Sequence, residues 1–267
     1  PYLNAKYYKS KYPNKLSLFY IAKVTRQIYR NIKLIEKFAD NILVSPAASA
    51  FFKRKVINIT LLGNPVYEKN PLIKSANISL SNVTKPLRIL HCPSDPETKG
   101  SIEIQKMINK LIQKGYSIKY SVITGQENEK VLAALKDVDI VVDSLWNESP
   151  AGTFPAEAAF CGNVVLIGSY FASSKYKNFT KRNEIPPYCF VTPNKFFDEL
   201  EKLVSDTNYL LKKKEEIYNY MNKNKNLNKI ALKYIELING KLSDDYYYEP
   251  SKVGYPFGYG ANSIRVG

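Results

Sequence analysis

The sequence predicts an α/β fold built on a parallel sheet with helices on both faces. Three observations lead to this prediction. Between residues 87 and 167, short apolar runs alternate with longer amphipathic segments, which is the spacing of β-α-β units. The apolar runs are nearly continuous, as expected for strands covered on both faces. Polar loops follow several of these runs, at the edge where a parallel sheet places its ligand crevice.

From Leu87 onward the expected elements follow in regular order. The strands are the short apolar runs, at 87–91, 117–123, 138–143 and 164–167. Residues 93–100 are expected to form a polar turn. The helices are amphipathic segments, at 101–114 (with Gly115 as the C-terminal cap), 127–137, 153–161, 195–204 and around 207–238.

The N-terminal part predicts a smaller and incomplete α/β portion. Residues 15–38 have apolar side chains at helical spacing, with Lys and Arg on the other faces. A short strand is expected at 41–44, a helix start at 45–48 and a second strand at 59–62. Residues 67–86 have no clear period and contain turn formers, so we expect a linker there.

These elements define the expected domain organisation. It comprises a partial N-terminal domain with its crossover (1–66), the linker (67–86), a Rossmann-like domain (87–194), C-terminal helices (195–243) and an irregular tail rich in Tyr and Gly (244–267).

The positive charge of the chain is concentrated at its N-terminal end. The formal net charge is +15, and the first 60 residues contain twelve Lys and Arg against two acidic residues. We expect an anionic partner there, and an anionic membrane surface fits residues 1–60 better than nucleic acid does. The alternative is that the basic helix expected at 15–38 is simply solvent-exposed, in a chain where lysine is the commonest polar residue.

Composition also excludes several classes of site. The three cysteines lie far apart and the chain has one histidine, so we expect no disulfide framework, zinc site or His-based triad. No apolar run reaches the length of about 18 residues that a membrane-spanning helix needs. We therefore expect reduced thiols in a cytoplasmic protein.

Candidate binding residues lie where loops enter helices. Lys99 precedes the helix at 101, and Gly152 and Thr153 begin the helix at 153, where backbone N–H groups favour a phosphate. Glu157 lies about one turn further on, placed to accept hydrogen bonds from the vicinal hydroxyls of a ribose. Phosphate and ribose together describe a nucleotide. As alternatives, Lys99 is an exposed lysine and Glu157 only complements a helix dipole.

The order of these residues resembles a known family. The segments LRILHCPS (87–94), Lys99 with Gly100, DIVVD (139–143) and GTFPAEAAFCGNVV (152–165) resemble, in sequence order, the donor-binding half of GT-B glycosyltransferases of the retaining family 4 type. The resemblance covers about 150 residues and rests on four motifs in order.

The resemblance implies roles for matching positions. Lys99 would hold the diphosphate of a nucleotide-sugar and stabilise the leaving group, with Glu148 as the second catalytic residue. Ser94, Gly125, Gly152 and Thr153 would line the donor site, and Glu157 would bind the ribose. Metal ions and other cofactors are not required in such enzymes, because cations and helix dipoles neutralise the diphosphate.

The sequence also departs from the family. Ser94 stands where an Arg is usual, and Ser149 where the first Glu of the family's Glu-x7-Glu pair falls, with Glu148 adjacent. Asn163 stands where the family has Pro. These departures favour nucleotide binding more strongly than efficient transfer.

The leading hypothesis is a metal-independent hexosyltransferase that moves a sugar from a nucleotide diphosphate sugar to a glycan or lipid-linked acceptor in surface polysaccharide synthesis. Only 86 residues precede Leu87, too few for an acceptor domain of comparable size. We expect further sequence or a partner chain to complete it, and a location at the inner face of the membrane. The alternatives are a non-catalytic nucleotide-binding or assembly module with a degenerate site and, less favoured, a sugar-nucleotide epimerase.

Overall fold

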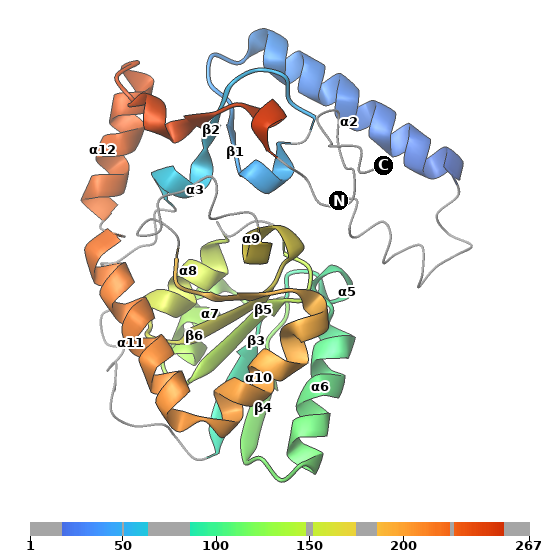
Figure 1. Ribbon diagram of the computed structural model, residues 1–267, viewed down its shortest axis with the longest axis vertical. Helices are drawn as coiled ribbons and strands as arrows, with labels where there is room; N and C mark the ends of the chain where they lie inside the picture. Colours follow the sequence, from blue (N-terminus) through green and yellow to red (C-terminus); the bar gives the residue numbers. More distant parts are fainter. Residues whose placement is uncertain are drawn as a thin grey trace. The chain divides into compact units, whose positions relative to one another are not determined.

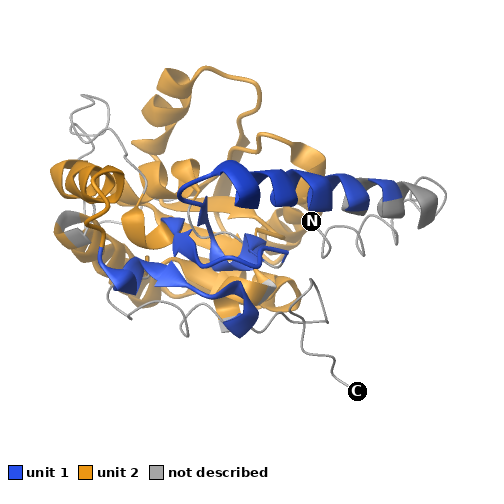
Figure 2. Ribbon diagram, turned by 90° about the horizontal axis from the view of Figure 1, so that it is seen from above, with its two compact units in different colours: residues 1–59, 243–267 blue, residues 60–242 orange. Residues whose placement is uncertain are grey.

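The computed structural model describes residues 18–49, 51–63, 86–147, 152–174, 186–224 and 227–253. The chain divides into two compact units, which Figure 2 shows in different colours. Unit 1 comprises residues 1–59 and 243–267, and unit 2 comprises residues 60–242. The N-terminal and C-terminal parts of the sequence therefore belong to the same unit.

Unit 2 is built on a five-stranded sheet in which all strand pairs are parallel. The strand order is β4-β3-β5-β6-β7. The bounds are β3 Leu87–His91, β4 Ile118–Val122, β5 Ile140–Ser144, β6 Val164–Gly168 and β7 Cys189–Val191.

Helices cover both faces of this sheet (Figure 1). One face packs against α6 (Ser101–Gln113) and α10 (Phe196–Ser205), and the other against α7 (Asn128–Leu135), α8 (Thr153–Phe160) and α11 (Thr207–Asn224). Successive strand residues alternate between the two cores: Ile89 contributes to the first and Leu90 to the second. The predicted α/β fold with a Rossmann-like parallel sheet is confirmed.

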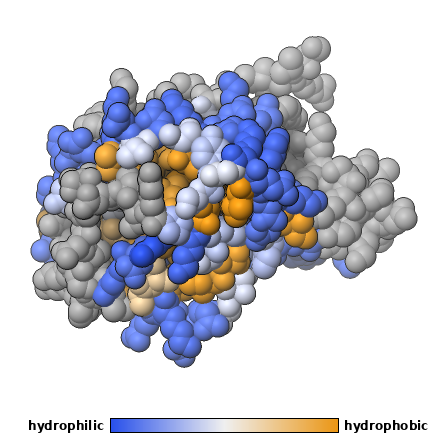
Figure 3. Space-filling model, turned by 90° about the horizontal axis from the view of Figure 1, so that it is seen from below, coloured by the Kyte–Doolittle hydropathy of each residue, from blue (hydrophilic) through white to orange (hydrophobic). Residues whose placement is uncertain are grey.

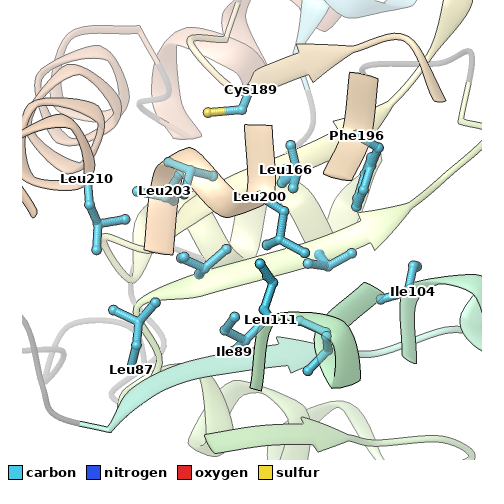
Figure 4. Packing of buried hydrophobic residues seen from close by; sticks show 14 of the residues in the cluster. Leu87, Ile89, Ile104, Leu111, Leu166, Cys189, Phe196, Leu200, Leu203 and Leu210 are labelled. Carbon is cyan, nitrogen blue, oxygen red and sulfur yellow. The ribbon is translucent and has the colours of Figure 1, made fainter. Parts of the chain in front are cut away.

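Close packing of aliphatic side chains holds the first of these faces. Figure 4 shows strand residues such as Ile89 and Leu166 lying between side chains of α6, including Ile104, and of α10, including Leu200. Both helix residues are completely buried. Burial of a side chain of this size stabilises the fold by about 1.5–3 kcal/mol, so the cores on the two faces fix the helices to the sheet.

The strand order places a topological switch point between β3 and β5. The chain leaves β3 to form β4 on one side, and the next strand, β5, pairs on the other side of β3. In open α/β sheets of this kind the ligand crevice lies at the carboxyl ends of the two strands where the order reverses. Here those ends are His91 and Ser144.

Most of the predicted elements of this region are present within one or two residues of their expected bounds. The turn expected at 93–100 contains a helical turn, α5 (Pro96–Lys99), because the Asp95 side chain accepts hydrogen bonds from the N–H groups of Glu97 and Thr98. The structure adds β7 and α9 (Tyr170–Ser174), which the sequence pattern did not predict, and divides the last helical region into α11 and α12 (Leu227–Ile238).

Unit 1 contains one long helix and a small sheet. The helix is α2 (Leu18–Phe38), and the sheet has the order β1-β2-β8, with β1 at Leu43–Val44 and β2 at Val56–Asn58. A 3₁₀ turn, η1 (Pro46–Ala48), lies at the expected helix start. The arginine side chain of Arg54 donates hydrogen bonds to backbone oxygens of Glu36, Ala39 and Asp40, which caps the C-terminal end of α2.

The second strand predicted in this region was misplaced. Residues 59–62 form a helical turn, α3 (Ile59–Leu62), and the strand precedes it. The run Ile-Thr-Leu-Leu suits either conformation because it is short and apolar. Val56 to Asn58 forms the strand because it finds two neighbours, β1 in parallel and β8 in antiparallel pairing.

The C-terminal segment differs from the irregular tail expected over 244–267. Residues 244–253 contain η5 (Asp244–Tyr246), β8 (Tyr247–Tyr248) and η6 (Pro250–Lys252), and β8 completes the sheet of unit 1. The remainder of that tail and most of the linker predicted at 67–86 lie outside the described residues.

Surface hydrophobic side chains are scattered along several helices. On the face shown in Figure 3, hydrophobic residues form small groups between hydrophilic ones. Within the described ranges, no helix combines the length and apolar character needed to cross a membrane.

Candidate ligand site at the switch point

Lys99 is held in place by the turn that precedes α6. It is the last residue of α5, and Gly100 joins α5 to α6 with a φ of 78°. A Cβ atom at Gly100 would lie 2.6 Å from the Trp146 ring, so this position requires glycine on two grounds. The Leu145 N–H donates to the Lys99 carbonyl oxygen at 3.0 Å, which connects the loop after β3 to the loop after β5.

The Lys99 ammonium group lies against a buried carboxylate. Its Nζ is 2.7 Å from Oδ1 of Asp143, the penultimate residue of β5. The other oxygen of Asp143 accepts a hydrogen bond from the Asn147 side chain at 2.8 Å. The Lys99 side chain is 24% exposed and that of Asp143 1% exposed. The partly exposed lysine therefore compensates the buried charge of Asp143.

His91, the lone histidine, is a buried structural residue at the end of β3. Its Nδ1 lies 2.8 Å from the Val142 carbonyl oxygen, which only accepts, so Nδ1 carries the proton. Nε2 then accepts from the Ser101 hydroxyl at 2.8 Å. Burial lowers the pKa of His91, with the Val142 hydrogen bond opposing it, so the ring is neutral and ties β3, β5 and α6 together.

Glu157 is the fifth of the eight residues of α8 and is nearly buried, with 8% of its surface exposed. Its Oε1 accepts a hydrogen bond from the Asn128 side chain, at the start of α7, at 3.1 Å. Burial raises the pKa of the Glu157 carboxyl, and the hydrogen bond from Asn128 partly offsets that rise. A carboxylate kept in such surroundings is more typical of a functional position than of a helix-dipole contact on the surface.

The pKa of the Cys92 thiol is affected by the charges of Lys99, Asp143 and Glu157. Burial raises the pKa of its thiol, the Glu157 and Asp143 carboxylates raise it further, and the Lys99 ammonium lowers it. The three charged groups therefore lie close enough to one side chain to act on it. Cys92 is a half-buried free cysteine, and Cys161 and Cys189 are buried free cysteines.

Helix α8 begins at Thr153, as the sequence predicts, and its glycine, Gly152, also has a packing role. Gly152 is the N-cap, with an ordinary φ of −67°, and Thr153 is the exposed first residue of the helix. A Cβ atom at Gly152 would lie 3.0 Å from the Pro155 ring, a tight contact that a small shift of the ring would have to relieve. Gly152 therefore has a packing reason besides the expected approach of a ligand.

Of the other predicted site residues, two lie in exposed loops and one lies outside the described residues. Ser94 is exposed in the loop after β3. Gly125 is exposed in the loop after β4, where its φ of 63° favours glycine. Glu148, predicted as catalytic, lies outside the described residues, as does Ser149.

Asn163, which stands where the resembled family has proline, has a structural explanation. Its side-chain amide donates to the carbonyl oxygens of Leu135 and Val138, at 3.1 and 2.6 Å. These carbonyls end α7 and follow it, so the buried amide caps that helix and joins it to the turn before β6. A proline would lack this amide.

Sequence reasoning missed the polar partners of the site. Asp143 was named only as the last residue of the DIVVD motif, and Asn128 and Asn147 were not singled out. No local pattern identifies these residues as partners, because Asp143 and Lys99 are 44 positions apart and Asn128 and Glu157 are 29 apart. A charged residue at the end of an apolar strand is the one signal that pointed to Asp143.

Comparisons with known proteins give structural likenesses only. No family model matches the chain, and no curated protein matches it. A sucrose-phosphate synthase from Thermosynechococcus elongatus is 16% identical, with a TM-score of 0.48 over 80% of this chain and 61% of that one. TarM is 15% identical, with a TM-score of 0.44 over 60% of this chain.

A further likeness is to the C-terminal domain of a glycosyl transferase group 1 family protein (LpcC) from Francisella tularensis. It is 14% identical, with a TM-score of 0.34 over 61% of this chain and 95% of that domain. By contrast, the chain spans only 36% of the length of TarM. The function proposed below therefore rests on the residues of the site.

Proposed function

We propose that unit 2 is the nucleotide-sugar-binding half of a GT-B glycosyltransferase. The observation that carries this proposal is the partly exposed Lys99 ammonium group held at the switch point, with the Glu157 carboxylate in α8, the helix that follows β5. A cation and a hydroxyl-accepting carboxylate at this edge of the sheet suit the diphosphate and the ribose of one ligand. The four motifs in family order point the same way.

In the proposed reaction each residue has a defined task. Lys99 donates hydrogen bonds to the diphosphate and stabilises its charge as the bond from the anomeric carbon to the diphosphate oxygen breaks. Glu157 accepts from the ribose hydroxyls, and the free N–H groups at the start of α8 face the phosphate. The sugar forms its new bond to an acceptor hydroxyl, whose proton passes to an oxygen of the departing diphosphate. Glu148 remains our proposal for the second catalytic residue.

The test is a calorimetric screen of UDP-, GDP- and ADP-sugars, followed by substitution of the two site residues. We expect one donor class to bind, and Lys99→Ala and Glu157→Ala each to weaken it at least about tenfold, the loss of one charge-assisted hydrogen bond. Lys106→Ala removes an exposed lysine on α6, the helix that follows Lys99, and is the matched control. Failure of every nucleotide-sugar to bind would overturn the proposal.

Transfer separates this proposal from the non-catalytic alternative. Movement of a labelled sugar to a glycan or lipid-linked acceptor, abolished by Glu157→Ala, is expected from a transferase. A degenerate binding module would bind the nucleotide without transfer.

We propose metal-independent transfer, which predicts that EDTA leaves the rate unchanged. Completion of the acceptor side by further sequence or a partner chain, within surface polysaccharide synthesis, belongs to the same proposal.

For residues 1–60 we propose an anionic membrane surface as partner, on the described part of α2. Leu34 is 57% exposed and Phe38 71% exposed, one turn apart on the same side of the helix. Five exposed cations lie along α2: Lys23, Arg26, Arg30, Lys33 and Lys37. The acidic Glu36 is occupied by the N–H groups of Lys53 and Arg54. Apolar side chains flanked by cations suit a lipid interface.

Vesicle binding tests the membrane proposal. We expect the full chain to bind vesicles of equimolar phosphatidylcholine and phosphatidylglycerol, and not vesicles of phosphatidylcholine alone. Leu34→Ser with Phe38→Ser should weaken binding about tenfold or more, because about 100–200 Å² of apolar surface is lost. Ile102→Ser removes an exposed apolar residue of α6 and should have no effect. Equal binding by all variants would contradict the role of α2.

A further inference from the structure

We propose that Asp143 is a specificity-determining residue. By sharing the Lys99 ammonium group, it makes the site favour a nucleotide-sugar over the more highly charged nucleoside diphosphate that transfer releases. This inference rests on the proposed function.

Asp143 is fixed where a ligand would meet its charge. One oxygen lies 2.7 Å from Lys99 and the other accepts from Asn147 at 2.8 Å. The backbone N–H of Asn147 in turn donates to the Gly168 carbonyl oxygen at 2.9 Å. At Gly168 a Cβ atom would lie 2.2 Å from the Leu145 carbonyl oxygen, so β6 and the loop after β5 are in close backbone contact. This anchoring keeps the carboxylate in place.

Lys99 cannot leave Asp143 without cost. Removal of one partner from a buried ion pair leaves an uncompensated charge, and Asp143 is 1% exposed. A bound phosphate is therefore expected to share the lysine with Asp143. An oxygen that accepts from Lys99 then lies within a few ångströms of the carboxylate, and each extra negative charge on that phosphate is repelled.

The other residues near the switch point do little to offset the repulsion between Asp143 and a bound phosphate. Of the groups that act electrostatically on Cys92, Lys99 is cationic, and Asp143 and Glu157 are acidic. At the position where the resembled family has an arginine, the chain has the exposed, uncharged Ser94. Within the described residues, the Lys99–Asp143 pair therefore offers a phosphate no net positive charge.

The donor and the product differ in the negative charge of the phosphate that would bind next to the Lys99–Asp143 pair. The terminal phosphate of a nucleoside diphosphate has a single bridging oxygen and a second proton that leaves at about pH 6, whereas the sugar in the donor blocks that ionisation. The product therefore carries up to one more negative charge at pH 7. Repulsion by Asp143 falls mainly on the product, so the same residue favours the donor relative to the product and promotes product release.

The experiment compares three ligands on the full chain by calorimetry. They are the best nucleotide-sugar from the screen, its nucleoside diphosphate and inorganic pyrophosphate. In Asp143→Asn we expect the nucleoside diphosphate and pyrophosphate to bind about tenfold more tightly, and the nucleotide-sugar to gain less. Asp137→Asn makes the same charge change on an exposed side chain just before β5, at the other end of the strand, and should alter no affinity.

Three outcomes would overturn the inference: an unchanged ratio of product to donor affinity, an equal loss for all ligands, or no pyrophosphate binding by either protein. An equal loss is what a merely structural role predicts. If Asp143→Asn unfolds, Asp143→Ser, which keeps an acceptor for Lys99, takes its place with the same expectation. Absence of nucleotide-sugar binding with tighter pyrophosphate binding in the variant would reject the proposed function and support the charge effect of Asp143.

Discussion

At the scale of single residues, Glu157 is kept in a position that costs stability. A carboxylate 8% exposed, with one hydrogen bond to Asn128, is poorly solvated, and burial accordingly raises its pKa. Ionisation of a group with a raised pKa opposes folding, so the folded state is best served by the protonated form. Residues retained at such a cost are frequently functional. A ligand role for Glu157, rather than a contribution to the dipole of α8, is therefore what we propose.

The pH dependence of stability tests this view of Glu157. Because the folded-state pKa is raised, the stability contributed by the protonated side chain is present below the ordinary glutamate range and lost as pH rises through the raised value. Glu157→Gln should therefore melt at a higher temperature than the parent at pH 7, and the difference should vanish below about pH 4. Thermal unfolding across this range measures it.

A matched substitution distinguishes burial from a general charge effect. Glu129→Gln changes an exposed glutamate on α7, next to Asn128, and should leave the melting temperature unchanged at both pH values. Equal melting of Glu157→Gln and the parent at pH 7 would contradict the buried-carboxylate interpretation.

At the scale of elements, one buried ion pair joins α11 to the sheet. Lys214 Nζ lies 2.6 Å from Oδ1 of Asp139, with 7% and 4% of the two side chains exposed. The other oxygen of Asp139 accepts from the Arg88 N–H at 3.1 Å, at the start of β3. The pair lies at the amino ends of β3 and β5, opposite the candidate site. Asp139 belongs to the resembled DIVVD motif, and its role here is structural.

Removal of the lysine should destabilise the chain strongly. We expect Lys214→Met to lower the free energy of unfolding by about 3–5 kcal/mol, because the buried Asp139 carboxylate loses its counter-charge. Lys212→Met, on an exposed position of the same helix, should change it by less than about 0.5 kcal/mol. Urea denaturation measures both, and similar values for the two variants would show that the pair contributes little.

At the scale of the whole molecule, the two ends of the sequence build one unit. Strand β8, from the C-terminal segment, pairs with β2 across Val56–Tyr248 and Ile57–Tyr247. The Tyr248 hydroxyl reaches past β2 and donates to the Val44 carbonyl oxygen in β1 at 3.2 Å, and Lys55 pairs with Asp244 at 2.8 Å. A two-stranded sheet is marginally stable by itself, so unit 1 depends on this returning strand.

Hydrogen exchange tests the contribution of β8. Tyr248→Pro should speed exchange of the β2 amides by about tenfold or more, because a proline removes a backbone donor and restricts φ in the strand. Tyr248→Phe removes the hydroxyl but keeps the backbone, so its effect should be smaller. Amides of β5, in unit 2, should exchange at unchanged rates in both variants. Unchanged β2 protection in Tyr248→Pro would mean that β8 does not stabilise the sheet.

The accuracy of the sequence prediction depended on how far apart the interacting residues lie. The strands of unit 2 and helices α6, α7 and α8 were predicted because each has a local apolar period that matches one conformation. The run at 59–62 was assigned the wrong structure because four apolar residues fit both a strand and a helical turn. Tyr247 and Tyr248 were expected in an irregular tail because their strand exists only through pairing with β2.

The sequence by itself determined the α/β class, the strands from Leu87 onward, the position of Lys99 just before α6 and that of Glu157 about one turn into α8. Local side-chain patterns suffice for these, since periodicity and turn chemistry act over a few residues. Only the tertiary structure brought Asp143 to Lys99, Asn128 to Glu157 and β8 to unit 1. Strand order and helix packing decide which distant segments meet, and the polar partners of the site lie on segments that the sheet brings together.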